Sequence, residues 1–387
     1  MRKCFGLIAT VLILSLAIVP GAWSADQINI GFDIPLTGDN PDVGASSKNA
    51  AEMYLKNTPT IDVGGKTYAL NFIYEDNEYK AESAVKAMTK LITVDNVLGV
   101  VGPQSSSHAV PAGEVANNNA TPMISPWSTN PNTTLNRPYV FRGCFLDPFQ
   151  GPVLADFATE ELGAKKAAVL FDIAADYPKG LAEFFQQAWE EKHGKGSVAA
   201  YESFTTRDTD FSSQLTKIIR SGAEVLFVPQ YYNEVALIVQ QAEDLGWQGP
   251  IVGSDSWGSA ETIGLCGEAC YGLFFSTHYA AAGAQGATKD FIDRYNERYG
   301  YVPDDVAALT WDALGLAQAA IEGAGEITGQ IKDDRKAVRD ALANVKDFQG
   351  ITGGMTFTEE GDPKKCAVIV RISDKGEYEF YKSICPE

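Results

Sequence analysis

Short apolar segments alternate with amphipathic segments along this chain, and that alternation limits the folds open to it. Helical stripes lie between the apolar segments, for example over residues 81–92 and 177–189. Apolar strands are expected in two series, at residues 28–34, 70–74 and 97–101 and then at 167–171, 225–228 and 251–252. Short apolar strands that are each followed by an amphipathic helix indicate parallel sheets covered on both faces. Two such series predict an α/β fold with two Rossmann-like lobes.

The order of the later elements predicts how the lobes are connected. After Phe275 the pattern returns to helices and then ends in an antiparallel hairpin; these segments are 287–299, 304–323, 332–345, 366–372 and 378–384. Because the first sheet lacks enough covering helices without them, we expect the chain to cross back near Ser276 and to return near residues 350–354. Lobe 1 would hold residues 26–143 and 277–350, and lobe 2 residues 144–276 and 351–387. Three crossings would form a hinge.

Residues 1–25 have the pattern of a cleavable secretory signal peptide. Arg2 and Lys3 precede an apolar run over residues 5–19, and small residues follow near Ser24. Cleavage removes two positive charges and no acid, which takes the formal net charge from −19 to −21. A surface this acidic repels nucleic acid and anionic lipid, and it also keeps a protein soluble. No other segment is long and apolar enough to span a bilayer.

The cysteines suit an exported protein with two disulfide bonds. Cys266 and Cys270 flank a short loop-like spacer, and no other Cys or His lies close enough in sequence to complete a metal site. A two-residue hairpin turn at Lys375-Gly376 would place Cys366 opposite Cys385. The expected pairs are therefore Cys266–Cys270 and Cys366–Cys385.

Ligands of open parallel sheets bind at the carboxyl ends of the strands, so the residues after each strand carry the functional prediction. Residues 102–107 follow the third strand and place three serines before a helix. Backbone N–H groups and serine hydroxyls at a helix N-terminus suit a carboxylate, although one serine also serves as an N-cap. The loop 125–131 would bring Trp127, Ser128 and Thr129 to the same mouth, unless it is only a proline-rich surface loop.

The second lobe offers aromatic rings and one carboxylate at its strand ends. These residues are Tyr177, Tyr231, Tyr232, Asp255 and Trp257. A single aromatic residue at such a place usually serves packing, and it is their shared position that indicates a ligand site. Asp255 would bind an ammonium group, which also gains from nearby aromatic faces. Donors for a carboxylate on one lobe and Asp255 on the other predict an α-amino acid as the ligand.

Five segments along the chain carry a family resemblance: Pro35-Leu36-Thr37-Gly38, Gly102–Ser107 with Pro111-Ala112, Ile124-Ser125-Pro126 with Thr129, Gly253-Ser254-Asp255, and Gly353–Gly361. In order and spacing they resemble the leucine/isoleucine/valine-binding proteins, the type I periplasmic binding proteins of ABC importers. The resemblance implies a hinged Venus-flytrap fold, a periplasmic location and permease subunits as partners; we expect a monomer. It places Ser106, Trp127 and Thr129 at the ligand carboxylate, Tyr177 and Tyr231 or Tyr232 in the second lobe, and Asp255 at the ammonium.

The resemblance leaves the side chain of the ligand open. Val43 stands near a position where many relatives have an aromatic residue, and Ala308 near one where the leucine-type proteins have a bulky aromatic wall. Alanine would enlarge the side-chain pocket, and Trp127 would refill part of it. A branched-chain, other aliphatic or aromatic amino acid fits, and an aromatic carboxylate or an amide is the alternative. Asp255 separates the two, because a buried carboxylate without a cation is unfavourable.

A periplasmic hydrolase and a sensor are the other functions to weigh. A hydrolase needs a nucleophile, a base and an orienting group, and His108, His193 and His278 are the histidines of the chain. His108 follows the serine run but has no evident partner. Cys144 fits a buried free thiol better than a nucleophile, since no His lies nearby in sequence. We therefore expect a binding protein, with or without a chemoreceptor partner, and neither an enzyme, a metal site nor a cofactor.

Overall fold

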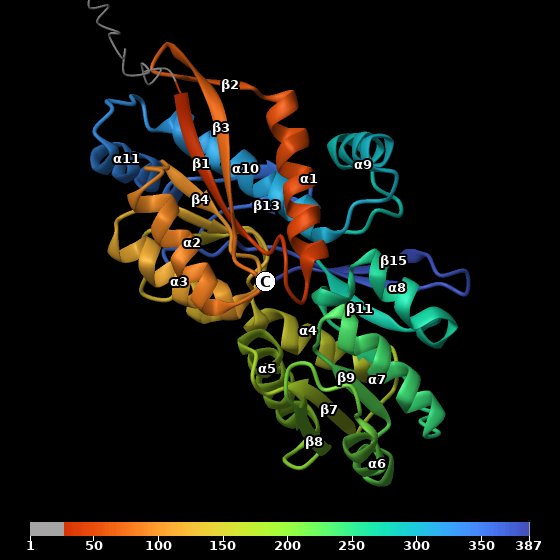
Figure 1. Cartoon of the computed structure of the whole chain (residues 1–387). Helices are drawn as coiled ribbons and strands as arrows, with labels where there is room; N and C mark the ends of the chain where they lie inside the picture. Colours follow the sequence, from red (N-terminus) through yellow and green to blue (C-terminus); the bar gives the residue numbers. More distant parts are fainter. Residues whose placement is uncertain (1–26, 387) are drawn as a thin grey trace, which may run out of the picture.

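A computed structural model describes residues 27–386 as two α/β lobes that face each other (Figure 1). Red, orange and blue segments form most of the upper lobe, and green segments form the lower one. The predicted signal peptide, residues 1–25, lies outside the described residues. Within the described part of the chain, every helix is too short or too polar to cross a membrane.

The first lobe is built on a six-stranded sheet with strand order β2-β3-β1-β4-β5-β6. Its strands are β1 (Gln27–Ile34), β2 (Thr60–Val63), β3 (Lys66–Asp76), β4 (Gly99–Val101), β5 (Met123–Ser125) and β6 (Val140–Arg142). Neighbouring strands are parallel except for the antiparallel pair β2 and β3. β1 is apolar and buried over most of its length because it lies inside the sheet. The first predicted series of strands corresponds to β1, to part of β3 and to β4.

Helices from both ends of the chain complete this lobe. They are α1 (Pro41–Asn57), α2 (Ala81–Thr93), α3 (Ser106–Asn118), α9 (Gly286–Tyr299), α10 (Asp305–Gly323) and α11 (Ile331–Ala343). Ala313, Leu316 and Ala320 of α10 share a buried cluster with Ile30 and Phe32 of β1. The late helices therefore cover the first sheet, as the sequence predicts, and their boundaries agree with the prediction to within two residues.

The second lobe is built on a seven-stranded sheet with strand order β15-β14-β11-β10-β9-β7-β8. β14 is antiparallel to both neighbours, and the other pairs are parallel. Its strands are β7 (Ala167–Asp172), β8 (Val198–Phe204), β9 (Val225–Val228), β10 (Ile251–Gly253), β11 (Phe274–Thr277), β14 (Ala367–Ile372) and β15 (Tyr378–Ile384). Its helices are α4 (Asp147–Glu160), α5 (Asp176–His193), α6 (Ser212–Arg220), α7 (Tyr232–Asp244) and α8 (Ala260–Cys266). Short 3₁₀ helices are η1 (Pro131–Thr133) in the first lobe and η2 (Asp255–Trp257) and η3 (Gly267–Cys270) in the second.

The chain passes between the lobes three times. The first crossing follows β6 at residues 143–146, and the second follows β11 at His278. The last crossing comes after a small separate ribbon, β12 (Phe348–Gly350) and β13 (Gly353–Met355). Asp362 still pairs with Arg142 of the first lobe. The third crossing therefore lies after residue 362 and not at the expected boundary between residues 350 and 351.

The C-terminal hairpin uses a longer loop than the expected two-residue turn at Lys375-Gly376. Ser373 bonds through its backbone N–H to the Glu377 carbonyl, so three residues form the loop, and Gly376 ends it with a left-handed φ of 72°. A bulge between Ile369 and Val370 shifts the register by one residue. The bulge cancels the extra loop residue and leaves the two ends of the hairpin facing each other.

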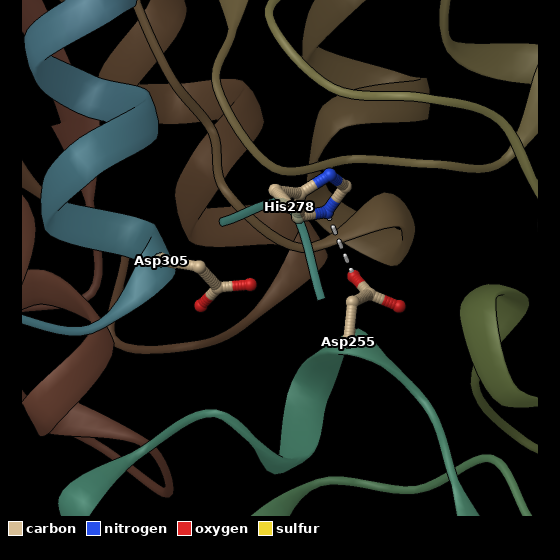
Figure 2. Close-up of side chains that lie close together, drawn as sticks. All are labelled: Asp255, His278 and Asp305. Atoms are coloured by element: carbon tan, nitrogen blue, oxygen red, sulfur yellow. Dashed lines mark hydrogen bonds and ion pairs between the residues drawn. The ribbon is translucent and has the colours of Figure 1, made fainter. Parts of the chain in front are cut away.

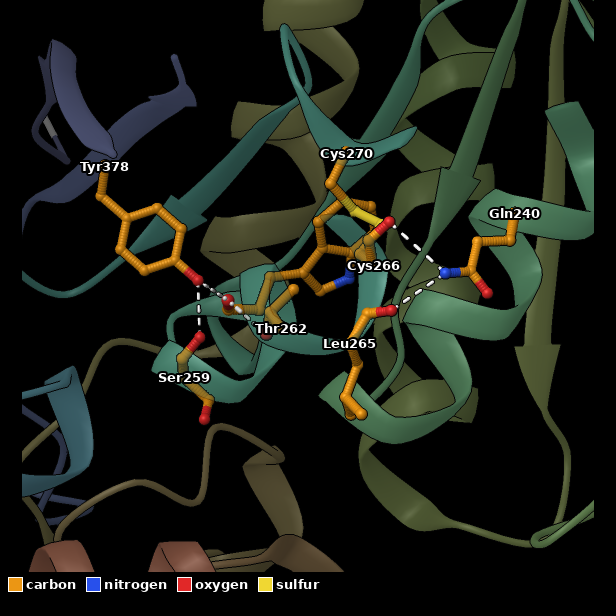
Figure 3. The surroundings of a disulfide bond; sticks show 8 residues. Gln240, Ser259, Thr262, Leu265, Cys266, Cys270 and Tyr378 are labelled. Atoms are coloured by element: carbon orange, nitrogen blue, oxygen red, sulfur yellow. Dashed lines mark hydrogen bonds between the residues drawn. A yellow bond between two sulfur atoms is a disulfide. The ribbon is translucent and has the colours of Figure 1, made fainter. Parts of the chain in front are cut away.

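Both expected disulfide bonds are present, Cys266–Cys270 and Cys366–Cys385. The first joins the end of α8 to η3, where Gln240 of α7 donates hydrogen bonds to the carbonyls of Leu265 and Cys266 at 2.9 and 3.4 Å (Figure 3). The second closes the open end of the hairpin. Cys144 is a buried free thiol, and burial raises its pKa to about 12.

Candidate functional site

The residues after β4 form one side of the cleft between the lobes. Ser105 is the N-cap residue of α3 and Ser106 is its first residue, and both side chains are buried. Ser106 Oγ lies 2.9 Å from Ser128 Oγ and accepts a hydrogen bond from the Asn130 backbone N–H at 3.4 Å. These contacts hold the serines at the end of a helix that still has free backbone N–H groups.

The loop after β5 carries Trp127, Ser128 and Thr129, and a buried arginine holds this loop. Arg142 of β6 donates to the Ser128 carbonyl at 2.7 Å and to Asp362 Oδ1 at 2.6 Å. The Ser128 hydroxyl is occupied by neighbouring side chains of the same lobe. Thr129 is buried, and its hydroxyl lies beside the Asp147 carboxylate, where it favours the charged form of that acid.

In the second lobe, Tyr177 and Asp255 form one hydrogen-bonded unit. Tyr177 lies in the first turn of α5, and Asp255 begins η2 directly after β10. The Tyr177 hydroxyl lies 2.6 Å from both Ser254 Oγ and Asp255 Oδ1, and Gln150 Nε2 donates to Asp255 at 2.7 Å. Uncharged donors therefore fix the orientation of a buried carboxylate.

The other predicted residues of the second lobe lie in three different places. Tyr231 reaches across the cleft, where its hydroxyl donates to Ser105 Oγ at 3.2 Å. Tyr232 lies outside the pocket wall and donates to Asp42 of α1 at 2.8 Å. Trp257 is fully buried in the core of its own lobe, and its N–H donates to the Val228 carbonyl at 3.1 Å. Trp257 is thus a core residue and not the expected ligand wall.

A narrow pocket lies where the two lobes meet. Its volume is only about 10 Å³, and it is lined by Gln104, Ser105, Ser106, Trp127, Tyr177, Tyr231 and Asp255. The fold therefore brings most of the predicted binding residues into one wall from distant parts of the chain. Ser128 and Thr129 share a loop with Trp127, but the wall itself does not include them.

Asp147 and Gln150 of α4 belong to this region, and reasoning from the sequence missed both. They are buried, and the hydroxyl of Thr129 is the polar side chain that interacts with the Asp147 carboxylate. Burial raises the pKa of Asp147 to about 8, and the charge of Asp255 adds to the effect. Both residues follow a crossing and not a strand, so the rule about strand ends passes over them. An acid in the first turn of a helix that opens the second lobe was the available signal.

Asp255 also approaches two groups at the hinge, His278 after β11 and Asp305 at the start of α10 (Figure 2). Their nearest nitrogen and oxygen atoms lie within 4.8 Å of one another, and all three residues are buried. Burial lowers the pKa of His278, whereas burial and the charge of Asp255 raise the pKa of Asp305. Both shifts reduce the charge that is buried in this group.

Contacts around the pocket close the lobes on each other. The Asp176 backbone N–H of α5 donates to Ser107 Oγ at 2.8 Å, and Arg207 pairs with Asp39 at 2.8 Å. Two hinged α/β lobes that bring polar and aromatic side chains together where they meet are typical of a solute-binding protein.

The chain belongs to the periplasmic binding protein family, whose sequence model matches residues 27–377. It is 31% identical over 341 residues to Leu/Ile/Val-binding protein homolog 3 of Brucella melitensis, covering 87% of this chain and 88% of the relative. The leucine-binding protein LivK of Thermotoga maritima is 32% identical, with a TM-score of 0.86 over 93% of this chain and 99% of that one. LivJ of Streptococcus pneumoniae, a branched-chain amino acid transporter substrate-binding protein solved with isoleucine, is 30% identical, with a TM-score of 0.83 over 93% and 100%. The predicted family and two-lobed fold are confirmed, and the family is one of binding proteins and not of enzymes.

Proposed function

We propose that the protein captures an α-amino acid between its lobes and delivers it to the permease subunits of an ABC importer. Export through cleavage of residues 1–25 would place the mature chain in the periplasm, where it would act as a monomer. Relatives named for leucine, isoleucine and valine, and a solved relative with isoleucine in its site, support this class of ligand.

The observation that carries the proposal is the arrangement of donors and buried acids around one pocket. Ser105 and Ser106 at the N-terminus of α3 suit the carboxylate of an amino acid. Asp255 in the wall suits its ammonium group, and Asp147 lies close enough to Asp255 for the two carboxylates to influence each other. A cation stabilises a buried carboxylate, and the ring of Tyr177 adds a further attraction.

An aromatic carboxylate or an amide is the second candidate ligand, and the same two acids disfavour it. Such a ligand brings no cation, so Asp147 would stay protonated and Asp255 would face a neutral or negative molecule in a buried site.

A chemoreceptor that recognises the closed form would use the same ligand. It is therefore an additional partner and not a competing function.

A thermal-shift screen of ligand-stripped, refolded mature protein tests the proposal. An amino acid that binds the folded state should raise the Tm in a concentration-dependent way. At a ligand concentration of a hundred times Kd, the free energy of unfolding should rise by about 2.7 kcal/mol. The deaminated analogue of the same amino acid should give no shift. Asp255→Ala should melt cooperatively but lose the response, whereas Asp374→Ala, at an exposed carboxylate on the hairpin loop, should keep it. Shifts with aromatic acids or amides and none with amino acids would overturn the proposal.

A further inference from the structure

A second cavity lies beside the hinge. Its volume is about 590 Å³, within the range of about 300 to 1,000 Å³ that is usual for small-molecule sites. Among the described residues, it shares none of its lining with the pocket between the lobes. We propose that this hinge cavity binds an organic amine with an apolar body, and that the bound amine favours the closed form of the protein. Its effect on amino-acid binding rests on the proposed function.

Both lobes contribute to the wall of the hinge cavity. Ile292 of α9 and the loop 302–305 line it from the first lobe. Ile263 of α8 and residues 376–378 of the C-terminal hairpin line it from the second. The segment 279–282, where the chain crosses for the second time, also belongs to the wall. A molecule that touches both lobes favours closure, because opening separates the two sides of its site.

Most of this wall is apolar. Phe275 and Val370 join Ile263 on the second lobe, and Val302 joins Ile292 on the first. Val302 is 51% exposed although its side chain is large and apolar. An aromatic ring or a short alkyl chain would gain free energy by leaving water for such a wall.

The wall is held in place by its surroundings. The Tyr378 hydroxyl donates to the Ser259 carbonyl at 2.6 Å (Figure 3). Tyr279 belongs to a buried cluster that includes Met53 and Ala308. Ala308 therefore lies behind this wall and does not enlarge the pocket between the lobes, contrary to the expectation from the sequence. A fixed wall loses little conformational entropy when a ligand binds.

The charges of the hinge cavity all have one sign. Its ionisable acids are Asp304, Asp305 and Glu377, and the described wall has no lysine, arginine or histidine. A wall of this kind attracts an ammonium group and repels an anion.

Asp305 connects the hinge cavity to the ligand-binding loop. Its Oδ2 accepts the Trp127 N–H at 3.2 Å and the Thr277 hydroxyl at 3.4 Å. Its Oδ1 lies toward Gly258 of the cavity wall, where a Cβ atom would be 3.4 Å away. An ammonium group in the cavity would favour ionised Asp305, which is a stronger acceptor for the Trp127 N–H. The amine should therefore fix Trp127 and strengthen amino-acid binding.

Calorimetric titration of ligand-stripped mature protein with three probes of one apolar body tests the inference. The probes are 2-phenylethylamine, 2-phenylethanol and 3-phenylpropanoate, with a positive, a neutral and a negative head. We expect the amine to bind roughly tenfold or more tightly than the anion, with the alcohol between them. Ala281→Trp, which fills the cavity, should abolish amine binding and change amino-acid affinity by less than about threefold.

Two exposed residues of the wall test the charge argument without disturbing the core. Glu377→Gln should weaken amine binding by about two- to fivefold. Val302→Lys should weaken it further and strengthen binding of the anion. Asp374→Asn, at a carboxylate of the same hairpin loop but outside the wall, is the matched control and should change neither.

Coupling between the two sites is measured with the amino acid that gives the largest thermal shift. Saturating amine should raise its affinity by roughly fivefold or more, and the amino acid should raise amine affinity by the same factor. Asp305→Asn, which cannot ionise, should lower this factor.

The outcomes separate this inference from the proposed function. Displacement of the amine by the amino acid would show that they share one site and would overturn the inference. Equal affinity for the three probes, or unchanged amine binding in Ala281→Trp, would overturn it as well. If Ala281→Trp does not fold, Glu377→Gln and Val302→Lys test the location instead. A protein that binds the amine but no amino acid would contradict the proposed function and leave the hinge cavity as a site.

Discussion

Asp147 is protonated in the ligand-free protein at neutral pH, because burial raises its pKa to about 8. The unfolded chain ionises the same group near pH 4. The unfolded state therefore binds fewer protons between about pH 4 and pH 8, and the stability of the free protein falls as the pH rises through this window and no further above it. An ammonium group beside Asp147 favours the carboxylate instead. Binding of an amino acid below pH 8 should thus release a proton.

We expect the affinity for an amino acid to rise between pH 6 and pH 8, by up to roughly tenfold per pH unit, and to level off above pH 8. Titrations in buffers with different ionisation enthalpies would measure the released proton directly. Asp147→Asn should flatten the profile, and Asp374→Asn on the surface should not. A pH-independent affinity of the wild type would show that Asp147 does not meet the ammonium group of the ligand.

Reasoning from strand ends located Ser106, Trp127, Tyr177, Tyr231 and Asp255, because backbone topology alone brings these positions to one edge. It did not give the direction of individual side chains. Trp257 shares a 3₁₀ turn with Asp255, yet its ring points into the core of the lobe. Gly253 leaves the space for this ring, because a Cβ atom at position 253 would lie 2.1 Å from the indole. Such directions depend on packing partners from other parts of the chain.

At the scale of elements, β6 supplies more than a strand to the site. Its last residue, Arg142, is fully buried and bonds to the Ser128 carbonyl, to the Thr134 hydroxyl at 2.8 Å and to Asp362. One guanidinium thus joins the ligand-binding loop to the segment that precedes the third crossing. The planar fork of arginine makes these bonds at once, and no other side chain has that geometry.

Arg142→Leu should lower the free energy of unfolding by about 3 kcal/mol, because it leaves buried acceptors without their donor. It should also weaken ligand binding, since the loop of Trp127 and Thr129 loses its support. Chemical denaturation and titration of the same variant would measure the two effects. Arg220→Leu, at an exposed position in α6, is the control and should change neither. An Arg142→Leu protein with wild-type stability would contradict this role.

The long amphipathic helices and the central strands could be predicted from periodicity, because each presents one continuous apolar face. The exact register of the C-terminal hairpin could not be predicted in this way. Its disulfide was expected from a two-residue turn, and the pairing is correct although the turn is not. The bulge between Ile369 and Val370 compensates for the longer loop, and nothing in the local pattern of apolar residues marks that bulge.

At the scale of the whole molecule, the closed form has bonds between the lobes that involve no ligand. Tyr232 donates to Asp42, and Arg207 pairs with Asp39; the side chains of Arg207 and Asp39 are 68% and 31% exposed. These contacts favour closure whatever the pocket between the lobes holds. They should therefore strengthen the binding of every ligand by the same factor.

We expect Arg207→Ala combined with Tyr232→Phe to weaken the binding of glycine and alanine equally, by about two- to tenfold, because exposed pairs and single hydrogen bonds each contribute about 1 kcal/mol or less. Titration of both ligands would measure the two factors. Lys289→Ala, which removes a surface pair within α9, should leave both affinities unchanged. A change in the ratio of the two affinities would show that the outer contacts also select the ligand.

The crossing back to the first lobe could be foreseen, because a sheet needs helices on both faces. The third crossing could not, since residues 351–362 follow no strand of either large sheet. Contacts with distant residues assign them to the first lobe: Ile351 and Thr352 bond to Asp312 of α10, and Asp362 pairs with Arg142.

The weak contacts between the lobes affect how the protein would work with a transporter. A binding protein that stayed closed without ligand would dock on the transporter unloaded, and that docking would transport nothing. Arg207 and Asp39 are exposed enough for salt to weaken their attraction. The empty protein can therefore reopen easily, and the cargo itself supplies most of the signal that a delivery is ready.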